Sequence, residues 1–262
     1  MGRFRLSKTC HSCGHEVDTG HKFCGSCGSP LKEERVGRSA ESVYESSAPM
    51  VHRARLRLVR GDSADGFVYH LQAQEHPVGR EVGSIEFPED TSVSAHHATF
   101  FYKEDRLYVR DEGSLNGVFL RLRDSVPIDD GEVFLCGEQV LRFDCYRPGA
   151  GPLGPDGAAF CGTPLVPWKF RVVQLLEGHE EGCARCCEKV AITIGREDCD
   201  LNFPLDRFIS RYHSRIEEKG DEFVLRDLDS RNGTYFRLKR EVPLSNGDQI
   251  FIGRQLLRVE IL

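Results

Sequence analysis

The fold of this chain is decided by a stretch that occurs twice. It reads Leu225-Arg-Asp-Leu-Asp-Ser-Arg-Asn-Gly-Thr234 and, 116 residues earlier (227 minus 111), Asp111-Glu-Gly-Ser-Leu-Asn-Gly117. The same offset places Arg55–Tyr146 on Arg171–Leu262 without a gap. A solenoid repeat spans roughly 20–50 residues, whereas a whole domain spans roughly 100 or more. The chain therefore contains two copies of one domain.

Both copies have the pattern of short β-strands. Residues Arg53–Val59 alternate basic and apolar side chains, and Leu107–Arg110 and Phe223–Arg226 are short runs rich in β-forming residues. Turn pairs such as Asn116-Gly117 and Asn232-Gly233 recur along both copies, and no segment shows a sustained helical period with capping residues. We therefore predict an all-β chain in which each repeat is one compact β-sandwich.

Composition divides the chain into five segments. A Cys- and Gly-rich start is followed by a Ser-, Ala- and Glu-rich linker, and a second linker dense in Pro and Gly separates the two repeats. The predicted segments are a ribbon over 1–35, a linker over 36–50, the first repeat over 51–146, a Pro/Gly linker over 147–167 and the second repeat over 168–262.

Charge and composition exclude several classes of protein. The 35 Lys and Arg residues against 41 Asp and Glu residues give a net charge of -6, which argues against a protein built mainly to coat nucleic acid. No apolar run approaches the roughly 18 residues that a membrane span needs. The N-terminus lacks the apolar centre of a secretory signal, and eleven cysteines without an export signal indicate a reducing compartment. We therefore expect a cytoplasmic protein with no membrane partner.

The polar residues that both repeats share fall at turns rather than within strands. In a β-sandwich the loops gather at the two ends, so loops from one repeat meet there. Arginine offers a planar fork to a phosphate dianion, serine donates a hydroxyl hydrogen, and asparagine both donates and accepts. Three such loops would form a small anion pocket. The shared residues are Arg80, Ser94 and Asn116 in the first repeat and Arg196, Ser210 and Asn232 in the second.

These motifs resemble the signature of the forkhead-associated (FHA) domain, and they do so in both repeats. The second repeat carries Ile194-Gly-Arg-Glu197, Ile209-Ser-Arg-Tyr-His-Ser214 and Leu225–Thr234, and the first carries Val78-Gly-Arg-Glu81, Val93-Ser-Ala-His-His-Ala98 and Asp111–Gly117. The resemblance implies two twisted β-sandwiches whose end loops bind phosphothreonine peptides. It also implies a non-catalytic adaptor in bacterial Ser/Thr-kinase signalling, with a phosphothreonine-containing protein such as a kinase or its substrate as partner.

The resemblance assigns a role to each shared residue. In the second repeat it implies that Arg196, Ser210 and Arg211 contact phosphate, that Asn232 holds the peptide main chain with Arg231 beside it, that His213 braces the loops, and that Gly195 and Gly233 form turns.

The first repeat matches the family at most of these positions and departs from it at two. Arg80, Ser94 and Asn116 match as binding residues, and Gly79, His97 and Gly117 match as structural residues. Ala95 replaces the basic residue that follows the serine, and Val118 stands where the family often has threonine. A lost charge-assisted bond costs about 1.5–3 kcal/mol, so we expect weaker phosphopeptide binding by the first repeat. Its surface then serves another partner, or residues from elsewhere support the phosphate.

A hydrolase is the alternative that the serine and histidine positions suggest. Ser94, His97 and Asp111, like Ser210, His213 and Asp227, have the residue types of a catalytic triad. The sequence has no glycine pair of a nucleophile elbow around either serine, and an open-loop serine lacks an evident oxyanion hole. Binding without catalysis is therefore the prediction.

The first segment contains two pairs of cysteines with metal-ligand spacing. Cys10 and Cys13 form one pair, Cys24 and Cys27 form the other, and a glycine follows each pair. Two residues between thiolates let one tight turn hold a tetrahedral ion, and a segment with no core of its own needs the metal to fold. The segment resembles a short bacterial zinc ribbon, which implies one structural Zn²⁺; iron in the same four-thiolate cage is the rival.

Other cysteines and histidines are interpreted more plainly. His11, His15 and His21 are expected to be surface residues, and Cys136 and Cys145 are expected to pack in strands. Another group suggests a second metal site, but two of its thiols align with apolar residues of the first repeat, which favours core or surface cysteines. This group is Cys161, His179, Cys183, Cys186, Cys187 and Cys199.

Zinc ribbons also leave a second function open. Because some of them bind nucleic acid, the alternative is a transcription-associated regulator whose ribbon contacts nucleic acid while the FHA domains recruit partners. The charge around the ribbon is only mildly basic, so docking to a protein, or a purely structural role, is at least as well supported.

Overall fold

A computed structural model describes residues 7–9, 16–18, 54–60, 66–146, 153–159, 161–162 and 168–262. The chain divides into two compact units, Met1–Ala48 and Pro49–Leu262. In the first unit β1 (Ser7–Thr9) pairs antiparallel with β2 (Glu16–Asp18). The four cysteines of the expected ribbon lie outside the described residues. Over the described part of the chain, no helix is long and apolar enough to cross a membrane.

The second unit is built from strands, as the turn-rich sequence predicts, apart from one 3-10 turn, η1 (Glu177–His179). The first repeat supplies β3 (Ala54–Arg60), β4 (Val68–Leu71), β5 (Glu75–Gly79), β6 (Ile85–Glu86), β7 (Ala98–Lys103), β8 (Arg106–Asp111), β9 (Val118–Arg121), β10 (Val126–Pro127), β11 (Val133–Cys136) and β12 (Gln139–Cys145). The second supplies β13 (Phe170–Leu175), β14 (Glu181–Cys187), β15 (Ala191–Gly195), β16 (Leu201–Asn202), β17 (Ser214–Lys219), β18 (Glu222–Asp227), β19 (Thr234–Arg237), β20 (Val242–Pro243), β21 (Gln249–Ile252) and β22 (Gln255–Ile261). The all-β prediction is confirmed.

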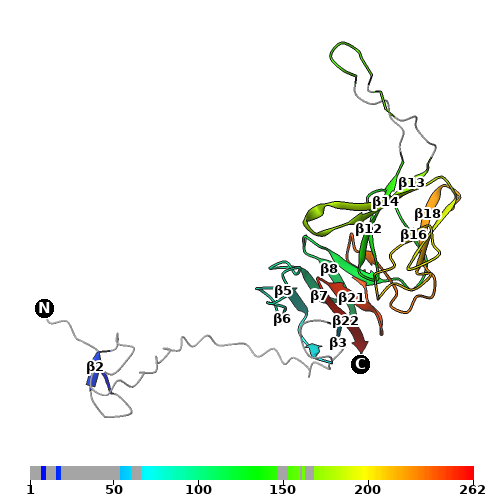
Figure 1. Cartoon of the computed structure of the whole chain (residues 1–262). Coiled ribbons are helices and arrows are strands. Elements are labelled where there is room, and N and C mark those ends of the chain that lie inside the picture. Colours follow the sequence, from blue (N-terminus) through cyan, green and yellow to red (C-terminus); the bar gives the residue numbers. More distant parts are fainter. Residues whose placement is uncertain are drawn as a thin grey trace. The chain divides into compact units, whose positions relative to one another are not determined.

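The strands form three sheets, and one of them runs through both halves of the unit. The long sheet has the order β14-β13-β12-β11-β19-β9-β21-β22-β3-β4. The two shorter sheets have the orders β20-β8-β7-β5-β6 and β10-β18-β17-β15-β16. Each short sheet packs against one half of the long sheet, which gives two sandwiches (Figure 1).

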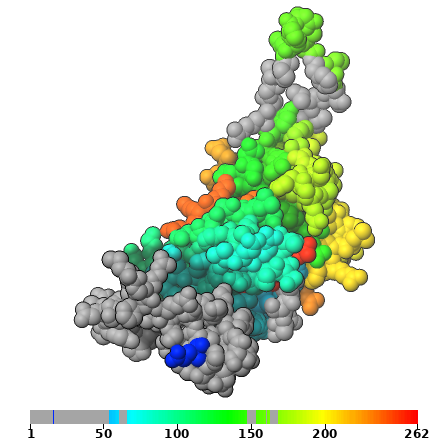
Figure 2. All heavy atoms as spheres, turned by 90° about the vertical axis from the view of Figure 1, so that its left-hand side faces the viewer, coloured from blue at the N-terminus to red at the C-terminus, as the bar shows by residue number. Residues whose placement is uncertain are grey.

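Each sandwich takes its last three strands from the other repeat. Strand β22 pairs with β3 and β20 pairs with β8, so the end of the second repeat completes the first sandwich. In the same way β12 pairs with β13 and β10 pairs with β18. Figure 1 shows the red β21 and β22 beside the cyan β3, and Figure 2 shows red and orange atoms of the chain end bordering cyan and green atoms of the first repeat.

The structure thus differs from the expectation that each repeat closes a sandwich of its own. The two repeats have the same alternation of apolar residues in their final strands, so the pattern does not specify which sandwich those strands complete. The connections after β9 and β19 are short and lead into the opposite sandwich. Identical local signals therefore support either arrangement, and only the tertiary structure distinguishes them.

The two halves meet at an antiparallel pair of equivalent strands. Strand β9 pairs with β19 so that Leu120 lies opposite Phe236, which is the same position in the other repeat (236 minus 120 is 116). A local twofold relation therefore passes through this residue pair. Phe119, Tyr235 and Phe251 form a small buried cluster beside it.

Both hydrophobic cores combine residues of the two repeats. In the first core Phe100 of the first repeat packs with Ile250 and Leu257 of the second. In the second core Phe134 and Phe143 of the first repeat join a core formed mainly by the second repeat, and both are fully buried. Burial of one such side chain contributes about 1.5–3 kcal/mol, so the exchanged strands cannot detach without large loss of stability.

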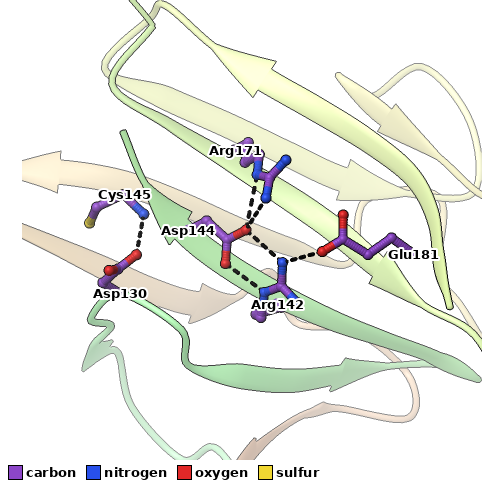
Figure 3. Close-up of polar contacts among 6 residues, drawn as sticks. All are labelled: Asp130, Arg142, Asp144, Cys145, Arg171 and Glu181. Carbon is purple, nitrogen blue, oxygen red and sulfur yellow. Dashed lines mark hydrogen bonds and ion pairs between the residues drawn. The ribbon is translucent and has the colours of Figure 1, made fainter. Parts of the chain in front are cut away.

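Charged side chains on the outer face of the long sheet join the exchanged strands to their new neighbours. Asp144 on β12 accepts hydrogen bonds from Arg142 at 2.6 Å and from Arg171 of the second repeat at 2.9 Å, and Arg142 also pairs with Glu181 at 2.5 Å (Figure 3). Beside this network, Asp130 accepts a hydrogen bond from the Cys145 amide. The two guanidinium groups hold the pKa of Asp144 below its usual range.

The equivalent carboxylate of the other repeat shares one of these contacts, because Arg55 is the counterpart of Arg171. Glu260 on β22 pairs with Arg55 and, at 2.7 Å, with Arg57 of the first repeat, and these arginines lower the pKa of Glu260 to about 2. Exposed ion pairs add little stability, but in both halves the carboxylate pairs with an arginine of the neighbouring strand from the other repeat, which favours this one strand register.

The strand exchange predicts which pairs of introduced cysteines a short reagent with two thiol-alkylating groups can join. Asp144 lies opposite Arg171 on neighbouring strands of different repeats. We expect the Asp144→Cys/Arg171→Cys variant to be bridged, so that cleavage at a protease site introduced into 147–167 leaves the halves linked on a denaturing gel. If each repeat closed its own sandwich, Asp144 would instead lie opposite Arg55, so the Arg55→Cys/Asp144→Cys control should give no bridge. Bridging of the control instead would contradict the exchanged topology.

Candidate functional site

The second repeat brings three loops together around Ser210. The Arg196 amide, directly after β15, donates to the Ser210 carbonyl at 2.9 Å. The Arg231 amide, in the loop between β18 and β19, donates to the Ser210 hydroxyl oxygen at 3.1 Å. The hydroxyl thereby accepts one hydrogen bond and keeps its own hydrogen to donate. The structure thus brings the loops of Arg196, Ser210 and Arg231 together at one end of the sandwich, where the sequence predicts an anion pocket formed by Arg196, Ser210 and Asn232.

A buried histidine fixes these loops. His213 is fully buried, its amide donates to the Ile194 carbonyl at 2.9 Å, and its Nδ1 accepts from the Ser210 amide at 3.0 Å. Its Nε2 donates to the Gly233 carbonyl at 3.0 Å, which fixes the neutral Nε2–H tautomer. Burial lowers the pKa of His213, in agreement with that neutral state. His213 therefore occupies the bracing position that the resemblance implies.

Asn232 ties the loop of Arg231 to the loop that carries Ser210. Its Nδ2 donates to the Phe208 carbonyl at 2.7 Å, and its Oδ1 receives no hydrogen bond from any residue that the structure describes. An amide with one end fixed presents the other end in a set orientation. The Oδ1 atom can thus accept a main-chain N–H from a peptide.

Only one of the three arginines of the second site is paired with a carboxylate of the described residues. Arg211 pairs with Asp198 at the rim, which raises the pKa of the guanidinium. Arg196 and Arg231 form no ion pair with a described residue. Both residues are joined to Ser210 through their backbone amides, so an anion is the ligand that these unpaired positive residues favour.

Two glycines of this site are required by close approach. A Cβ on Gly195 would lie 2.1 Å from the Arg211 carbonyl oxygen. Gly233 has a φ of +85°, and a Cβ there would lie 2.1 Å from the Nε of Arg121. A side chain at position 195 would displace the loop that holds Ser210, whereas one at position 233 would strain the backbone and displace the Arg121 side chain.

The first repeat repeats this geometry at its own loops. The Arg80 amide donates to the Ser94 carbonyl at 3.0 Å, and the Leu115 amide donates to the Ser94 hydroxyl oxygen at 3.1 Å. Asn116 donates to the Ser92 carbonyl at 2.7 Å. The fully buried His97 accepts from the Ser94 amide at 3.0 Å and donates to the Gly117 carbonyl at 3.1 Å, and burial lowers its pKa.

The first site has less positive charge than the second. Ala95 provides no counterpart to Arg211, as the sequence indicates, and the Arg80 guanidinium pairs with Glu81 at 3.0 Å. The Nε atom of Arg80 is buried and has no hydrogen-bond partner among the described residues. Gly79 approaches the Ala95 carbonyl so closely that a Cβ would lie 2.0 Å from its oxygen. The backbone of the site is thus conserved within the chain, whereas its charge is not.

Two residues that sequence reasoning missed come from the opposite repeat. Arg237 of the second repeat lies against Gly117 and contacts the Leu115 carbonyl at 3.4 Å. Its counterpart Arg121 lies against Gly233. Both arginines match under the repeat offset, which was the available signal, but their position at the sites follows only from the strand exchange.

One buried aspartate in each site also ties that site to the other repeat. Asp206 accepts from the Phe208 amide at 2.8 Å with one oxygen, and with the other from the Glu138 amide and the Gln139 side chain, both at 2.8 Å. Asp90 makes the equivalent bonds, each at 2.8 Å, to the Arg254 amide and the Gln255 side chain. Because these residues precede Ser210 and Ser94 in the same loops, the exchanged strands support both sites.

The hydrolase alternative does not fit this geometry. The Nδ1 of His213 accepts from the backbone amide of Ser210, and its Nε2 donates to a carbonyl, so neither ring nitrogen faces the serine hydroxyl as a base. Asp227 bonds the Ser230 amide and the Thr234 hydroxyl instead of the histidine. The three residues serve as loop supports.

The described cysteines lie in different environments. Cys136 is fully buried against the Ser214 hydroxyl at 3.0 Å, and burial raises the pKa of its thiol to about 12. Cys183 and Cys186 are exposed on β14, whereas Cys187 is buried. Within the described ranges, no group of three or more His, Cys, Asp or Glu residues is arranged to hold a metal ion.

Comparison with known proteins relates the chain to one family at its two repeats and to another at its N-terminus. A family model described as FHA domain matches residues 77–137 and 192–253, and one described as zinc-ribbon domain matches residues 9–31. The FHA domain-containing protein FhaB of Mycobacterium tuberculosis is 27% identical over 128 residues, which cover 46% of this chain and 83% of that protein. The oxoglutarate dehydrogenase inhibitor of Corynebacterium jeikeium is 31% identical over 108 residues, which cover 40% of this chain and 69% of that protein.

A solved structure from a study of phosphothreonine-dependent FHA domain interactions also aligns with the chain. The alignment covers 80% of this chain and 97% of that one, with 12% sequence identity and a TM-score of 0.31.

The buried histidines predict how stability changes with pH. Because burial lowers the pKa of His97 and His213, the unfolded chain binds protons first as the pH falls. Stability should be complete above the usual histidine pKa of about 6.5 and decline below it. We expect the His97→Gln/His213→Gln variant to be less stable at pH 7.5 but to lose less stability between pH 6.5 and 5, measured by thermal unfolding. His76, whose pKa burial also lowers, leaves a residual slope in both proteins; equal slopes would contradict the assignment.

Proposed function

Since the chain belongs to the FHA domain family and carries two such domains, we propose that it binds phosphothreonine-containing peptides and acts as a non-catalytic cytoplasmic adaptor in Ser/Thr-kinase signalling. The partner is then a phosphothreonine-containing protein, either a Ser/Thr kinase or one of its substrates. A single observation carries the proposal. The backbone amides of Arg196 and Arg231 both bond Ser210, so these two residues, which have no carboxylate partner among the described residues, begin beside its hydroxyl.

The chemistry of these groups suits a phosphate dianion. A phosphorylated threonine carries about -1.5 to -2 charges at pH 7 and three acceptor oxygens. Arg196 supplies charge-assisted donors, and Ser210 donates its hydroxyl hydrogen because its oxygen already accepts from the Arg231 amide. Arg211 adds a further positive charge at the rim, although Asp198 holds it in the free protein.

Recognition of a peptide requires a group that holds its main chain. Asn232 is oriented by its bond to the Phe208 carbonyl, and its Oδ1 can accept a peptide N–H. The loops are fixed beforehand by His213 and Asp206, so little ordering entropy opposes binding.

The first domain uses Arg80, Ser94 and Asn116 in the same way, with lower affinity. It lacks a counterpart of Arg211, and Glu81 competes with phosphate for Arg80. The two sites together raise avidity toward a partner that is phosphorylated at two positions.

For the N-terminal segment, we propose one structural Zn²⁺ held by Cys10, Cys13, Cys24 and Cys27. The match to a zinc-ribbon family over residues 9–31 supports this, and four thiolates with this spacing suit a tetrahedral ion. The ion stabilises the segment, which serves a structural or protein-docking role.

Removing the guanidinium of the second site should abolish most binding. Against an Arg80→Ala background that weakens the first site, we expect Arg196→Ala to lower affinity for a phosphothreonine peptide about 10- to 150-fold, which corresponds to about 1.5–3 kcal/mol for a charge-assisted bond. Isothermal titration calorimetry measures this change. The matched control is Arg185→Ala, because Arg185 is exposed on β14 and lies outside the site loops. Undiminished affinity of the Arg196 variant, or equal affinity for the unphosphorylated peptide, would refute the proposed site.

The ribbon proposal predicts the metal content of the purified protein. Mass spectrometry of metals should find one zinc per chain in the full-length protein, and replacing Cys10 and Cys13 by serine should remove it. The substitution Cys183→Ser/Cys186→Ser on β14 is the control and should leave the zinc in place. Iron instead of zinc would correct the ion, and metal retained by the Cys10/Cys13 variant would overturn the ligand set.

A further inference from the structure

We propose that the two sites select different neighbours of the phosphothreonine: the first prefers an apolar side chain and the second an acidic one. The deciding residues are Leu115 and Arg231, which occupy equivalent positions of the two repeats. This proposal rests on the proposed function, because it concerns the residues that flank a bound phosphothreonine.

The backbone places both side chains at the same point of the two sites. The Leu115 amide donates to the Ser94 hydroxyl oxygen at 3.1 Å, and the Arg231 amide donates to the Ser210 hydroxyl oxygen at 3.1 Å. The next residue in each loop is the asparagine, Asn116 or Asn232, that is suited to hold a peptide main chain. Each side chain therefore starts beside the phosphate position and next to the path of the peptide.

The first site exposes apolar side chains where the second has charges. Leu115 is 66% exposed and Val82 is 62% exposed, although the Val82 amide bonds the Ala95 carbonyl at 3.4 Å directly beside Ser94. The counterparts of Val82, Ala95 and Leu115 in the second repeat are Asp198, Arg211 and Arg231.

The exposed side chains of Val82 and Leu115 contribute favourable free energy only when a ligand buries them. Val82 bonds Ala95 and Leu115 bonds Ser94 through their backbone amides, so both exposed apolar residues begin beside a site that retains Arg80, Ser94 and Asn116. A ligand that fills the pocket with phosphate would place its neighbouring side chain on this surface. An apolar side chain removes that surface from water, whereas a carboxylate would lose its hydration there without gaining a cation.

The second site offers the opposite environment. Arg231 is exposed and forms no ion pair with a described residue, whereas the nearby Arg211 is already paired with Asp198. The Arg231 guanidinium is therefore free to bind a carboxylate next to the phosphate. It would gain nothing from an apolar neighbour.

The strand exchange keeps Leu115 in place. Arg237 from the opposite repeat contacts the Leu115 carbonyl at 3.4 Å and lies against Gly117, so the first loop is held on both sides of Asn116. Arg121 takes the equivalent position against Gly233 in the second site. Both loops thus present their deciding side chain from a supported backbone, and the difference between the sites lies in the side chains.

The test uses the full-length protein with one site inactivated at a time. Arg196→Ala/Ser210→Ala leaves the first site, and Arg80→Ala/Ser94→Ala leaves the second. Each protein is incubated with a phosphothreonine peptide library that is randomised at the flanking positions, and the retained peptides are sequenced. We expect Leu, Ile, Val or Phe to be enriched by the first site and Asp or Glu by the second.

Individual peptides then measure the size of the preference. Exchanging an acidic for an apolar neighbour should raise affinity of the first site about tenfold, in keeping with partial burial of one aliphatic side chain. The same exchange should lower affinity of the second site about two- to fivefold, as for an exposed ion pair. Reciprocal substitutions, Leu115→Arg in the first site and Arg231→Leu in the second, should reverse both preferences. Both positions are exposed, and circular dichroism verifies that the variants fold.

The outcomes separate this inference from the proposed function. If both sites bind phosphothreonine peptides with the same neighbour preference, or if the reciprocal substitutions leave the preferences unchanged, the inference is wrong and the proposed function stands. If the first site retains apolar peptides equally well without phosphate, its dependence on phosphothreonine is wrong. If neither site distinguishes phosphorylated from unphosphorylated peptides, the proposed function itself fails.

Discussion

The antiparallel pairing of β9 with β19 is the contact on which the rest of the second unit depends. Leu120 lies opposite Phe236, its own equivalent, so the two repeats are joined by a strand pair with a local twofold axis. Beyond this pair each chain segment enters the other sandwich and places Phe134, Phe143, Ile250 and Leu257 in its core. Loss of either exchanged segment would open a core in the opposite half, so the two repeats are one cooperative structure.

That topology also determines how the sites are supported. A histidine fully buried under each site fixes three loops with neutral hydrogen bonds, and an aspartate beside each serine binds the backbone of the opposite repeat. Arg121 and Arg237 extend the same dependence to the loops that follow the asparagines. The order in each site therefore derives from packing that involves both repeats, whereas the affinity for an anion derives from a few exposed charges.

Much of this could be predicted from the sequence, because local chemistry specifies it. Turn pairs and alternating apolar residues indicated the β-sandwich fold, and the spacing of Arg196, Ser210, His213 and Asn232 indicated residues that the structure brings together. The exchange could not be predicted in this way. Both repeats present the same apolar pattern in their last strands, so either sandwich satisfies it, and the choice depends on short connections and on contacts between distant residues. Arg121, Arg237 and the buried aspartates were missed for the same reason.

The strand exchange changes how two domains in one chain can bind a partner together. Two domains on a flexible linker sample many separations, and the length and stiffness of the linker set the effective concentration of the second site. Here residues 147–167 join β12 to β13, which are already neighbours in one sheet, so that linker does not set the distance between the sites. The continuous sheet sets it instead, so under the proposed function a partner that engages both sites has to present two phosphothreonines at one fixed separation. Avidity then becomes a form of selectivity, because a partner with another spacing binds through one site alone.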